Sequence, residues 1–262
     1  MKSDITAPDE AVRIKLCAAD VILLAVPEGV ALSALPALVG FVRSDVLFVE
    51  TLSVKSSFNE AVRRVAPGHQ ALGLNPMFAP ALGLPGRPVA AVVHHDGPLV
   101  HPLLEQVRRG GGRVVTVKAS EHDRLTAASQ ALTHAAVLAF GTALAELDVD
   151  IETLHALAPP PHSAMLALLA RILSGSPEVY WDIQAGNPLA LEARRALSSG
   201  IRQLDDVVAP RFPPTGEADF ARALDRIRNV LGGRLGDYSQ LCTSLFTRLP
   251  QHPEWPSGGT SC

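Results

Sequence analysis

The sequence predicts an α/β domain built on a parallel sheet, followed by an all-α domain. In the first 118 residues short apolar runs alternate with helical patterns, which is typical of doubly wound sheets. From Ser120 onward the apolar residues recur at helical spacing, and no strand pattern interrupts them. Hydrophobic residues make up 47% of the 262 residues and charged residues 19%, as in ordinary globular proteins. We therefore expect domains over 1–118 and 119–250, with a flexible tail over 251–262.

Five short apolar runs predict the strands of the first domain. The clearest is Ala19–Pro27, which is closed by proline and has the pattern of a parallel strand buried on both faces. The other runs lie at 46–49, 71–74, 89–93 and 113–117, and helical patterns lie between them at 30–42, 57–65 and 99–109.

The second domain begins with a long apolar helix from Ser120 to about Glu146. Ser120 is a suitable N-cap, and acidic residues follow in the first turn. Residues 125–145 carry no formal charge and could span a bilayer by length, but they are rich in alanine and interrupted by polar residues. We therefore expect a buried helix of a soluble protein, covered by other helices and by a second subunit. Further helices are predicted near 151–157, 162–173, 178–184, 188–207 and 217–246.

Charge and cysteine content exclude several classes of protein. With 23 basic and 26 acidic residues, the chain lacks the positive charge of a nucleic-acid surface. Three scattered cysteines do not form a disulfide framework or a zinc site, and no secretory leader pattern is present, so we expect a cytoplasmic protein. His94, His95 and His101 are clustered, but we expect them in a solvated loop and predict no metal site.

Four segments carry more specific patterns: Ala19–Pro27 with its final Val-Pro, Leu52–Lys55, Leu72–Pro80, and Glu121–His134 with an initial Glu-His-Asp. In this order they resemble the prephenate dehydrogenase family, whose members oxidise and decarboxylate prephenate. Gly236-Asp237-Tyr238 also resembles a family feature. The resemblance implies an NAD(P)-binding Rossmann domain, a helical dimerisation domain and an active site between them. It also implies a homodimer acting on a small cyclohexadienyl substrate.

The resemblance also implies roles for individual residues. Ser53 and Asn75 would address the substituent at ring C4, and Gln130 and His134 would address a substrate carboxylate. Catalytic roles are thus expected for Ser53, Asn75 and His134. Substrate contacts are expected for His122, Gln130 and Ser163, and contacts with NAD or NADP for Val26, Pro27, Ser53, Lys55, Pro76 and Met77.

The front end of the family pattern is not found in this sequence, so we expect a partial dinucleotide-binding domain over 1–118, truncated at its N-terminal part rather than naturally shortened. The family opens with a strand and a Gly-x-Gly-x-x-Gly turn that holds the pyrophosphate, whereas residues 1–15 contain no glycine. In the usual strand order the first strand lies in the middle of the sheet, so its absence is expected to leave an apolar edge. The choice between NAD and NADP is not readable without this segment.

Asn75 stands where the family has a histidine that assists hydride loss from C4. Asparagine takes no proton, but its side-chain oxygen accepts a hydrogen bond. A ring with an amine at C4 suits this residue better, because the nitrogen lone pair expels hydride without prior loss of an O–H proton. We therefore expect the substrate 4-amino-4-deoxyprephenate. The alternatives are prephenate or arogenate, and a catalytically silent dimer that binds an aromatic precursor or a partner protein.

Arginines that the family uses for a substrate carboxylate are also missing. Ser163 and Ala185 stand at the two positions where branches of the family carry one. The sequence leaves open whether His122, Gln130, His162 or Arg171 replaces it.

Overall fold

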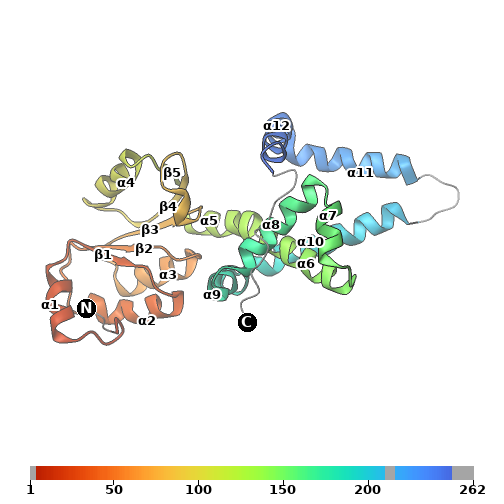
Figure 1. The fold of residues 1–262 in the computed structure, drawn as a ribbon. Helices are drawn as coiled ribbons and strands as arrows, with labels where there is room; N and C mark the ends of the chain where they lie inside the picture. The colour runs from red at the N-terminus through yellow and green to blue at the C-terminus, as the bar shows by residue number, and fades with distance from the viewer. Residues whose placement is uncertain (1–3, 210–215, 250–262) are drawn as a thin grey trace, which may run out of the picture. The chain divides into compact units, whose positions relative to one another are not determined.

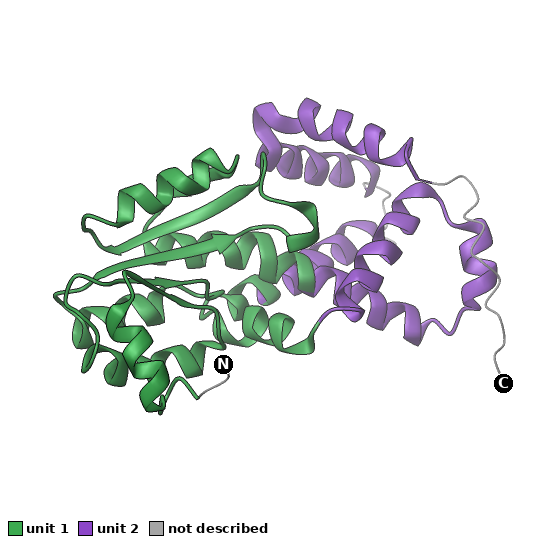
Figure 2. Ribbon diagram, turned by 60° about the vertical axis from the view of Figure 1, so that its left-hand side comes forward, with its two compact units in different colours: residues 1–134, 176–194 green, residues 135–175, 195–262 purple. Residues whose placement is uncertain are grey.

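The computed structural model describes residues 4–209 and 216–249, and within these the chain forms two compact units (Figure 2). The first, here called the sheet unit, contains residues 1–134 and 176–194. The second, the helical unit, contains residues 135–175 and 195–262. The sequence boundary proposed at 118 marks the end of the strand pattern, while the sheet unit also includes the first helical residues after it. The tail proposed over 251–262 lies outside the described residues.

The five predicted strands form one five-stranded sheet in the order β1-β2-β3-β4-β5 (Figure 1). Neighbouring strands are parallel except for β3 and β4, which are antiparallel. The strands are β1 (Val21–Leu24), β2 (Leu47–Glu50), β3 (Gln70–Pro76), β4 (Pro88–His95) and β5 (Arg113–Thr116).

The reversal at β4 corrects the expectation of a wholly parallel sheet. A parallel connection needs a crossover of a dozen or more residues, usually a helix. Residues 77–87 between β3 and β4 contain only a 3₁₀ turn, η1 (Pro80–Leu82). The chain therefore turns back directly and pairs antiparallel.

Helices cover both faces of the sheet because the central strands are apolar on both sides. Phe48 packs with residues of α2 (Glu28–Val39) and α3 (Ser56–Val65), while Leu47 and Val49 pack with α4 (Val100–Arg109) on the other face (Figure 1). All three side chains are buried. The sheet unit also contains α1 (Glu10–Ala18), α5 (Ala119–Thr126), α9 (Pro177–Trp181) and the π-turn η3 (Asp182–Gly186).

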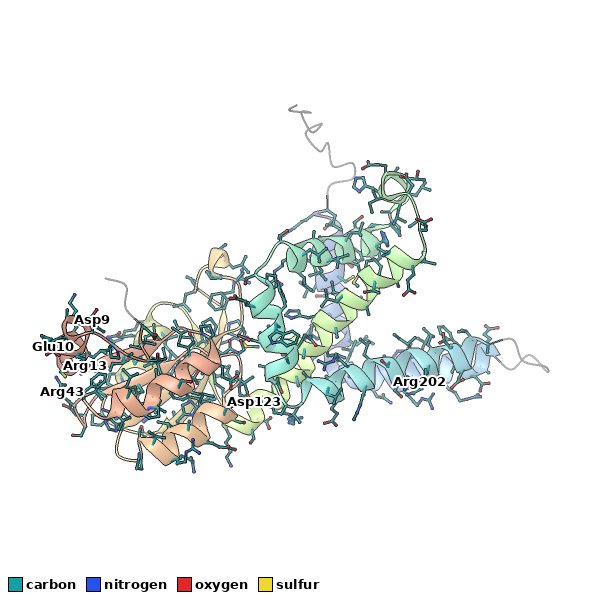
Figure 3. All side chains as sticks on the ribbon, turned by 90° about the horizontal axis from the view of Figure 1, so that it is seen from below. Asp9, Glu10, Arg13, Arg43, Asp123 and Arg202 are labelled. Atoms are coloured by element: carbon teal, nitrogen blue, oxygen red, sulfur yellow. The ribbon has the colours of Figure 1, made fainter. Side chains whose placement is uncertain are left out.

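The amino ends of β1 and β2 are joined by an exposed ion-pair group. Arg43, labelled in Figure 3, lies just before β2 begins. It donates to Asp20 and to Asp45, each at 2.8 Å. These groups lie at the opposite ends of the strands from Leu24 and Glu50.

The strand β1 lies at an edge of the sheet and pairs only with β2 among the described residues. Val21 and Leu23 on this strand are 42% and 58% exposed. The apolar edge expected from the sequence is therefore present at β1.

The predicted helices of the second half are confirmed, with three interruptions, of which one is the π-turn η3 inside the helix predicted near 178–184. The long helix from Ala119 to Glu146 contains a π-turn, η2 (Ala127–Ala131), and Gly232 with a φ of 51° breaks the predicted helix over 217–246. The elements after η2 are α6 (Leu132–Glu146), α7 (Ile151–Leu157), α8 (Pro160–Leu173), α10 (Ala190–Val208), α11 (Gly216–Leu231), η4 (Gly232–Arg234) and α12 (Leu235–Phe246).

The helix over 119–146 is long and apolar enough to cross a membrane, by length and composition only. Its first turns, in α5, carry the buried polar residues His122, Asp123 and Thr126. In α6, all of which the structure describes, Val137 is the one fully buried residue. Among the residues that the structure describes, the burial expected for α6 is therefore incomplete.

Gly73 in β3 leaves the space that two polar side chains of the neighbouring strands occupy. A Cβ at this position would overlap Oε1 of Glu50 and lie 2.9 Å from Nε2 of His94. We expect Gly73→Ala to lower the free energy of unfolding by about 1–3 kcal/mol in urea denaturation, because neither buried neighbour can move freely.

Gly68→Ala is the matched control, since no atom lies within 4 Å of its added Cβ. We expect it to change stability by less than about 1 kcal/mol. Equal stability of the two variants would contradict the packing argument.

Candidate active site

A fully buried ammonium group lies beside the carboxyl ends of β2 and β3. Nζ of Lys55 donates to Oε2 of Glu50 at 2.6 Å, to the carbonyl of Leu52 at 2.8 Å and to the carbonyl of Leu74 at 3.2 Å. Burial lowers the pKa of Lys55, while the carboxylates of Glu50 and Asp123 act in the opposite direction. The three donors of the ammonium are all used within the protein.

Lys55 therefore holds the backbone of two expected catalytic residues. Leu52 directly precedes Ser53, and Leu74 directly precedes Asn75. The ammonium binds both carbonyls, which fixes the loop after β2 against the end of β3. This geometry leaves Lys55 no free donor for a cofactor, in contrast to the expectation from the sequence.

The carboxylate of Glu50 is satisfied from both sides. Its Oε2 also accepts from the backbone N–H of Leu52 at 2.7 Å, and its Oε1 lies 3.0 Å from Nε2 of His94. His94 is buried on β4, and its Nδ1 lies 3.2 Å from Oδ1 of Asn59. The placement of His94 in a solvated loop was wrong, because the strand extends through His95.

Asp123 on α5 caps the N-terminus of α3, 67 residues earlier in the chain. Its carboxylate accepts from the backbone N–H groups of Lys55 at 2.8 Å and Ser56 at 2.9 Å. Burial acts to raise the pKa of Asp123, but hydrogen bonds from His122, Ser56 and Lys55 outweigh it and lower this pKa below its ordinary value. The carboxylate thus supplies the acceptor that the helix start lacks.

His122 connects this carboxylate to Asn75. Its Nδ1 lies 2.9 Å from Oδ1 of Asp123, and its Nε2 lies 3.0 Å from Nδ2 of Asn75. His122 is 1% exposed and Asn75 is 8% exposed. Because both ring nitrogens of His122 have protein partners, its geometry suits the support of Asn75 better than the direct substrate contact expected from the sequence.

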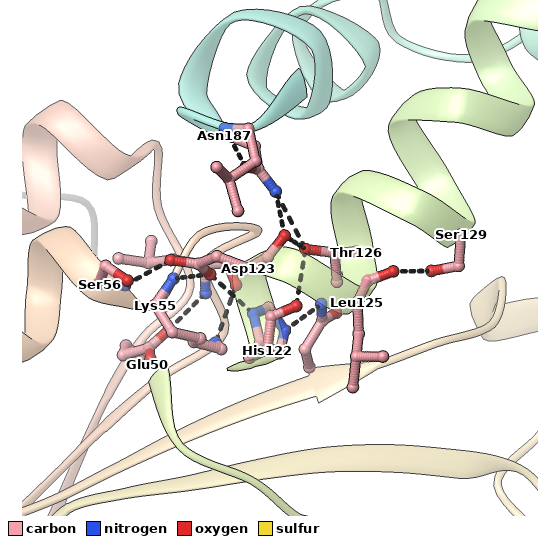
Figure 4. A network of polar contacts seen from close by, with 12 residues as sticks. Glu50, Lys55, Ser56, His122, Asp123, Leu125, Thr126, Ser129 and Asn187 are labelled. Atoms are coloured by element: carbon pink, nitrogen blue, oxygen red, sulfur yellow. Dashed lines mark hydrogen bonds and ion pairs between the residues drawn. The ribbon is translucent and has the colours of Figure 1, made fainter. Parts of the chain in front are cut away.

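The later segment of the sheet unit, residues 176–194, completes the network (Figure 4). Nδ2 of Asn187 donates to the carbonyl of Asp123 at 2.8 Å and to Oγ1 of Thr126 at 3.1 Å. All three residues are buried. Asn187 therefore joins the 176–194 segment to α5 within the sheet unit.

A cavity of about 780 Å³ opens at the carboxyl ends of β1 and β2. Three residues expected to contact the cofactor, Val26, Pro27 and Ser53, line it. The other lining residues are Ala25, Glu28, Thr51, Leu52, Pro177, Glu178, Val179, Trp181 and Asp182. The lining therefore combines an apolar strand end with three acidic residues and no basic one.

Glu28 is a site residue that the sequence reasoning missed. Burial raises the pKa of its carboxyl, a hydrogen bond from Ser57 acts against this, and the carboxylate of Asp182 raises it further. A carboxyl group of this kind is suited to exchange a proton with a ligand. The available signal was its position directly after Val26-Pro27, the pair expected at the nicotinamide.

The remaining expected residues lie in several places. His134 packs edge-on against Tyr180, with ring centroids 5.1 Å apart. Tyr180 belongs to α9, the helix that forms one wall of the cavity. Gln130 lies in the π-turn η2, and such turns recur at functional sites. Pro76 and Met77 follow at the end of β3, and Ser163 lies on α8 in the helical unit.

The cavity fits the ring end of a nicotinamide cofactor but not its pyrophosphate. Ala25, Val26 and Pro27 offer an apolar surface, and the hydroxyl of Ser53 adds a polar group. The acidic side chains would repel a pyrophosphate, and the described residues before β1 contain no glycine-rich turn. Among the described residues, the lining therefore suits the ring of such a cofactor and not its pyrophosphate.

Comparison with known proteins identifies the family. Residues 118–228 match the family described as "Prephenate dehydrogenase, dimerization domain". The 4-amino-4-deoxyprephenate dehydrogenase of Streptomyces pristinaespiralis is 52% identical over 246 residues, which cover 94% of this chain and 82% of that protein. The chain belongs to the prephenate dehydrogenase family.

Two further similarities agree with this assignment. A probable arogenate/prephenate dehydrogenase of Methanocaldococcus jannaschii is 26% identical over 194 residues, covering 72% of this chain and 44% of that protein. The crystal structure of prephenate dehydrogenase from A. aeolicus in complex with hydroxyphenyl propionate and NAD⁺ superposes with a TM-score of 0.66 at 16% identity, covering 83% of this chain and 77% of that chain. The fold expected from the resemblance is confirmed, and the chain is an oxidoreductase of this family.

The buried ion pair allows a test of what holds the strand ends together. Lys55→Met leaves the Glu50 carboxylate buried without its cation, and we expect a loss of about 3–5 kcal/mol in the free energy of unfolding. In the double variant Glu50→Gln/Lys55→Met no uncompensated charge remains, so most of this loss should be recovered. Urea denaturation of both variants measures the difference, and equal losses would contradict the charge argument.

Proposed function

We propose that this protein oxidises and decarboxylates 4-amino-4-deoxyprephenate with a nicotinamide dinucleotide, to give 4-aminophenylpyruvate. The observation that carries the proposal is the 52% identity, across 94% of the chain, to a 4-amino-4-deoxyprephenate dehydrogenase. Asn75, in place of the family histidine, supports the same substrate. Antibiotic biosynthesis is a pathway type that fits an amino-substituted precursor, and the similar enzyme comes from a Streptomyces species.

The proposed reaction requires little covalent chemistry from the protein. A hydride leaves ring C4, the bond from C1 to the ring carboxylate breaks to release CO₂, and the electrons of that bond complete the aromatic ring. The bound nicotinamide supplies the hydride acceptor, and we propose NAD first, with NADP as the alternative. Aromatisation drives the reaction, so the side chains mainly orient the substrate.

Asn75 and Ser53 are proposed to address the C4 substituent. Asn75 is held at the end of β3 by His122, and Ser53 lies in the cavity wall. An amide oxygen accepts an N–H but takes up no proton, which suits an amine whose own lone pair assists hydride departure. Gln130 and His134 are proposed to contact a carboxylate, and Ser163 to lie at the substrate.

Prephenate or arogenate is the second candidate substrate. The archaeal relative described as a probable arogenate/prephenate dehydrogenase favours it. A catalytically silent dimer of the same fold is the remaining alternative, favoured by the acidic lining of the cavity, which does not suit a pyrophosphate. The same assay distinguishes the three.

Substrate choice is tested by following reduced nicotinamide with 4-amino-4-deoxyprephenate and with prephenate. We expect kcat/KM for the amine to exceed that for prephenate by about 10²-fold or more, because a hydroxyl substrate lacks its general base here. Higher turnover of prephenate would assign the protein to that substrate. Absence of both activities under conditions where the cofactor binds would favour the silent dimer.

Asn75→His provides the matched variant for this assay. We expect it to raise prephenate turnover by about 10²-fold, since it restores a base at the C4 substituent. Asn75→Ala serves as the control that removes the amide without adding a base. A prephenate rate unchanged in Asn75→His would show that Asn75 does not select the substrate.

We further propose that the protein is a soluble, cytoplasmic homodimer. The matching family is described as a dimerisation domain, and the match includes the apolar helix α6, all of α10 and most of α11. Four exposed apolar residues of α11 recur at helical spacing and form one stripe: Phe220, Leu224, Ile227 and Leu231. A second copy would cover this stripe. The buried Asp123 at the start of the helix over 119–146 is hydrogen-bonded to the backbone of Lys55 and Ser56, which supports a soluble protein over a membrane span.

The double variant Leu224→Glu/Ile227→Glu tests this assembly. We expect it to be monomeric by light scattering, because the carboxylates would be buried without partners. Arg226→Glu, on the same helix but off the stripe, should stay dimeric. A wild-type protein that is monomeric at micromolar concentration, or a double variant that remains dimeric, would refute the proposal.

A further inference from the structure

The orientation of the Asn75 amide is fixed by a chain of hydrogen bonds that begins at Asp123. The carboxylate of Asp123 is held ionised by hydrogen bonds from the backbone of Lys55 and Ser56. An ionised carboxylate only accepts hydrogen bonds, so the nitrogen of His122 that faces it at 2.9 Å carries the proton. That nitrogen is Nδ1.

The other ring nitrogen of His122 is then determined. A neutral imidazole with its proton on Nδ1 has a lone pair on Nε2, so Nε2 accepts a hydrogen bond. The atom 3.0 Å away is Nδ2 of Asn75, a donor. Donor and acceptor therefore alternate without conflict from Asp123 through His122 to Asn75.

We propose that His122 is a positioning residue that presents Oδ1 of Asn75, rather than its NH₂ group, to the substituent at ring C4. Since Nδ2 is occupied by His122, the acceptor atom of the amide is the one left for a ligand, and the described structure shows no hydrogen bond to it. A fixed acceptor favours a substrate group that donates. This inference rests on the proposed function, because it explains how the site would hold an amine N–H.

The same arrangement explains why a buried histidine serves here. His122 and Asp123 are each 1% exposed, so neither ring flips nor water exchange supply alternative partners easily. The carboxylate of Asp123 holds the proton of His122 on Nδ1, so Nε2 on the other side of the ring is an acceptor with a fixed direction. Asn75 could otherwise rotate about its terminal torsion and offer either end of the amide.

The tautomer of His122 is measurable without any substrate. In the full-length, uniformly ¹⁵N-labelled protein, long-range ¹H–¹⁵N correlation spectra distinguish a protonated from an unprotonated ring nitrogen, and the His122→Gln spectrum assigns the signals. We expect Nδ1 protonated and Nε2 unprotonated at neutral pH. A proton on Nε2 with Nδ1 unprotonated overturns the proposed orientation.

Substrate preference provides the second test. His122→Phe keeps a planar ring but removes the acceptor for Nδ2, so the amide loses its anchor. We expect the ratio of kcat/KM for 4-amino-4-deoxyprephenate to that for prephenate to fall by about 5- to 100-fold. His122→Gln places an amide oxygen near the position of Nε2 and should keep most of the preference.

His95→Phe is the matched control, because it makes the same substitution at a histidine outside the Asp123–His122–Asn75 chain. His95 ends β4, and its Nδ1 lies 3.1 Å from the carbonyl of His69. It should leave the preference unchanged. A folded His122→Phe with the wild-type preference overturns the inference. A wild-type enzyme that does not favour the amine refutes the proposed function instead, and the tautomer then decides the orientation by itself.

Discussion

The ammonium of Lys55 is the interaction on which the rest of the site depends. It draws together the side chain of Glu50 at the end of β2, the carbonyl before Ser53 and the carbonyl before Asn75. A buried cation is costly unless every donor is used, so these three partners are required rather than optional. The side-chain-free position at Gly73 leaves the space in which this group fits. The same ammonium group thus stabilises the sheet unit and fixes the positions of Ser53 and Asn75.

A second charge, that of Asp123, organises the other half of the site. It replaces the missing cap of α3, sets the proton of His122 and, through its backbone, receives Asn187. The two charged groups are connected directly, because the backbone N–H of Lys55 is one of the donors to Asp123. The residues that would touch a ligand, Ser53 and Asn75, are therefore neutral groups held by buried ions. Such preorganisation suits a reaction in which orientation is the main task.

The sequence predicted the elements well and their connections less well. Each of the five apolar runs is a strand, because a short apolar run indicates a strand that is buried in the sheet. Such a run has the same pattern in both directions, so it does not predict the direction of the strand. The reversal of β4 follows from the short loop before it. The helix α1 buries none of its residues and left no apolar period to detect. Ser53 and Asn75 were identified through family motifs. The roles of Lys55 and His94 were not, since their partners lie on neighbouring strands and come together only in the folded chain.

The discontinuity of the sheet unit has a consequence for its synthesis. Residues 135–175 leave the ribosome between the two segments that form the unit, and Asn187 follows them. Until then the carbonyl of Asp123 and the hydroxyl of Thr126 lack the amide that joins them to the later segment. The contact between α5 and the later segment therefore forms only after residues 135–175 of the other unit have been made. We expect the two units to mature together during translation rather than one after the other.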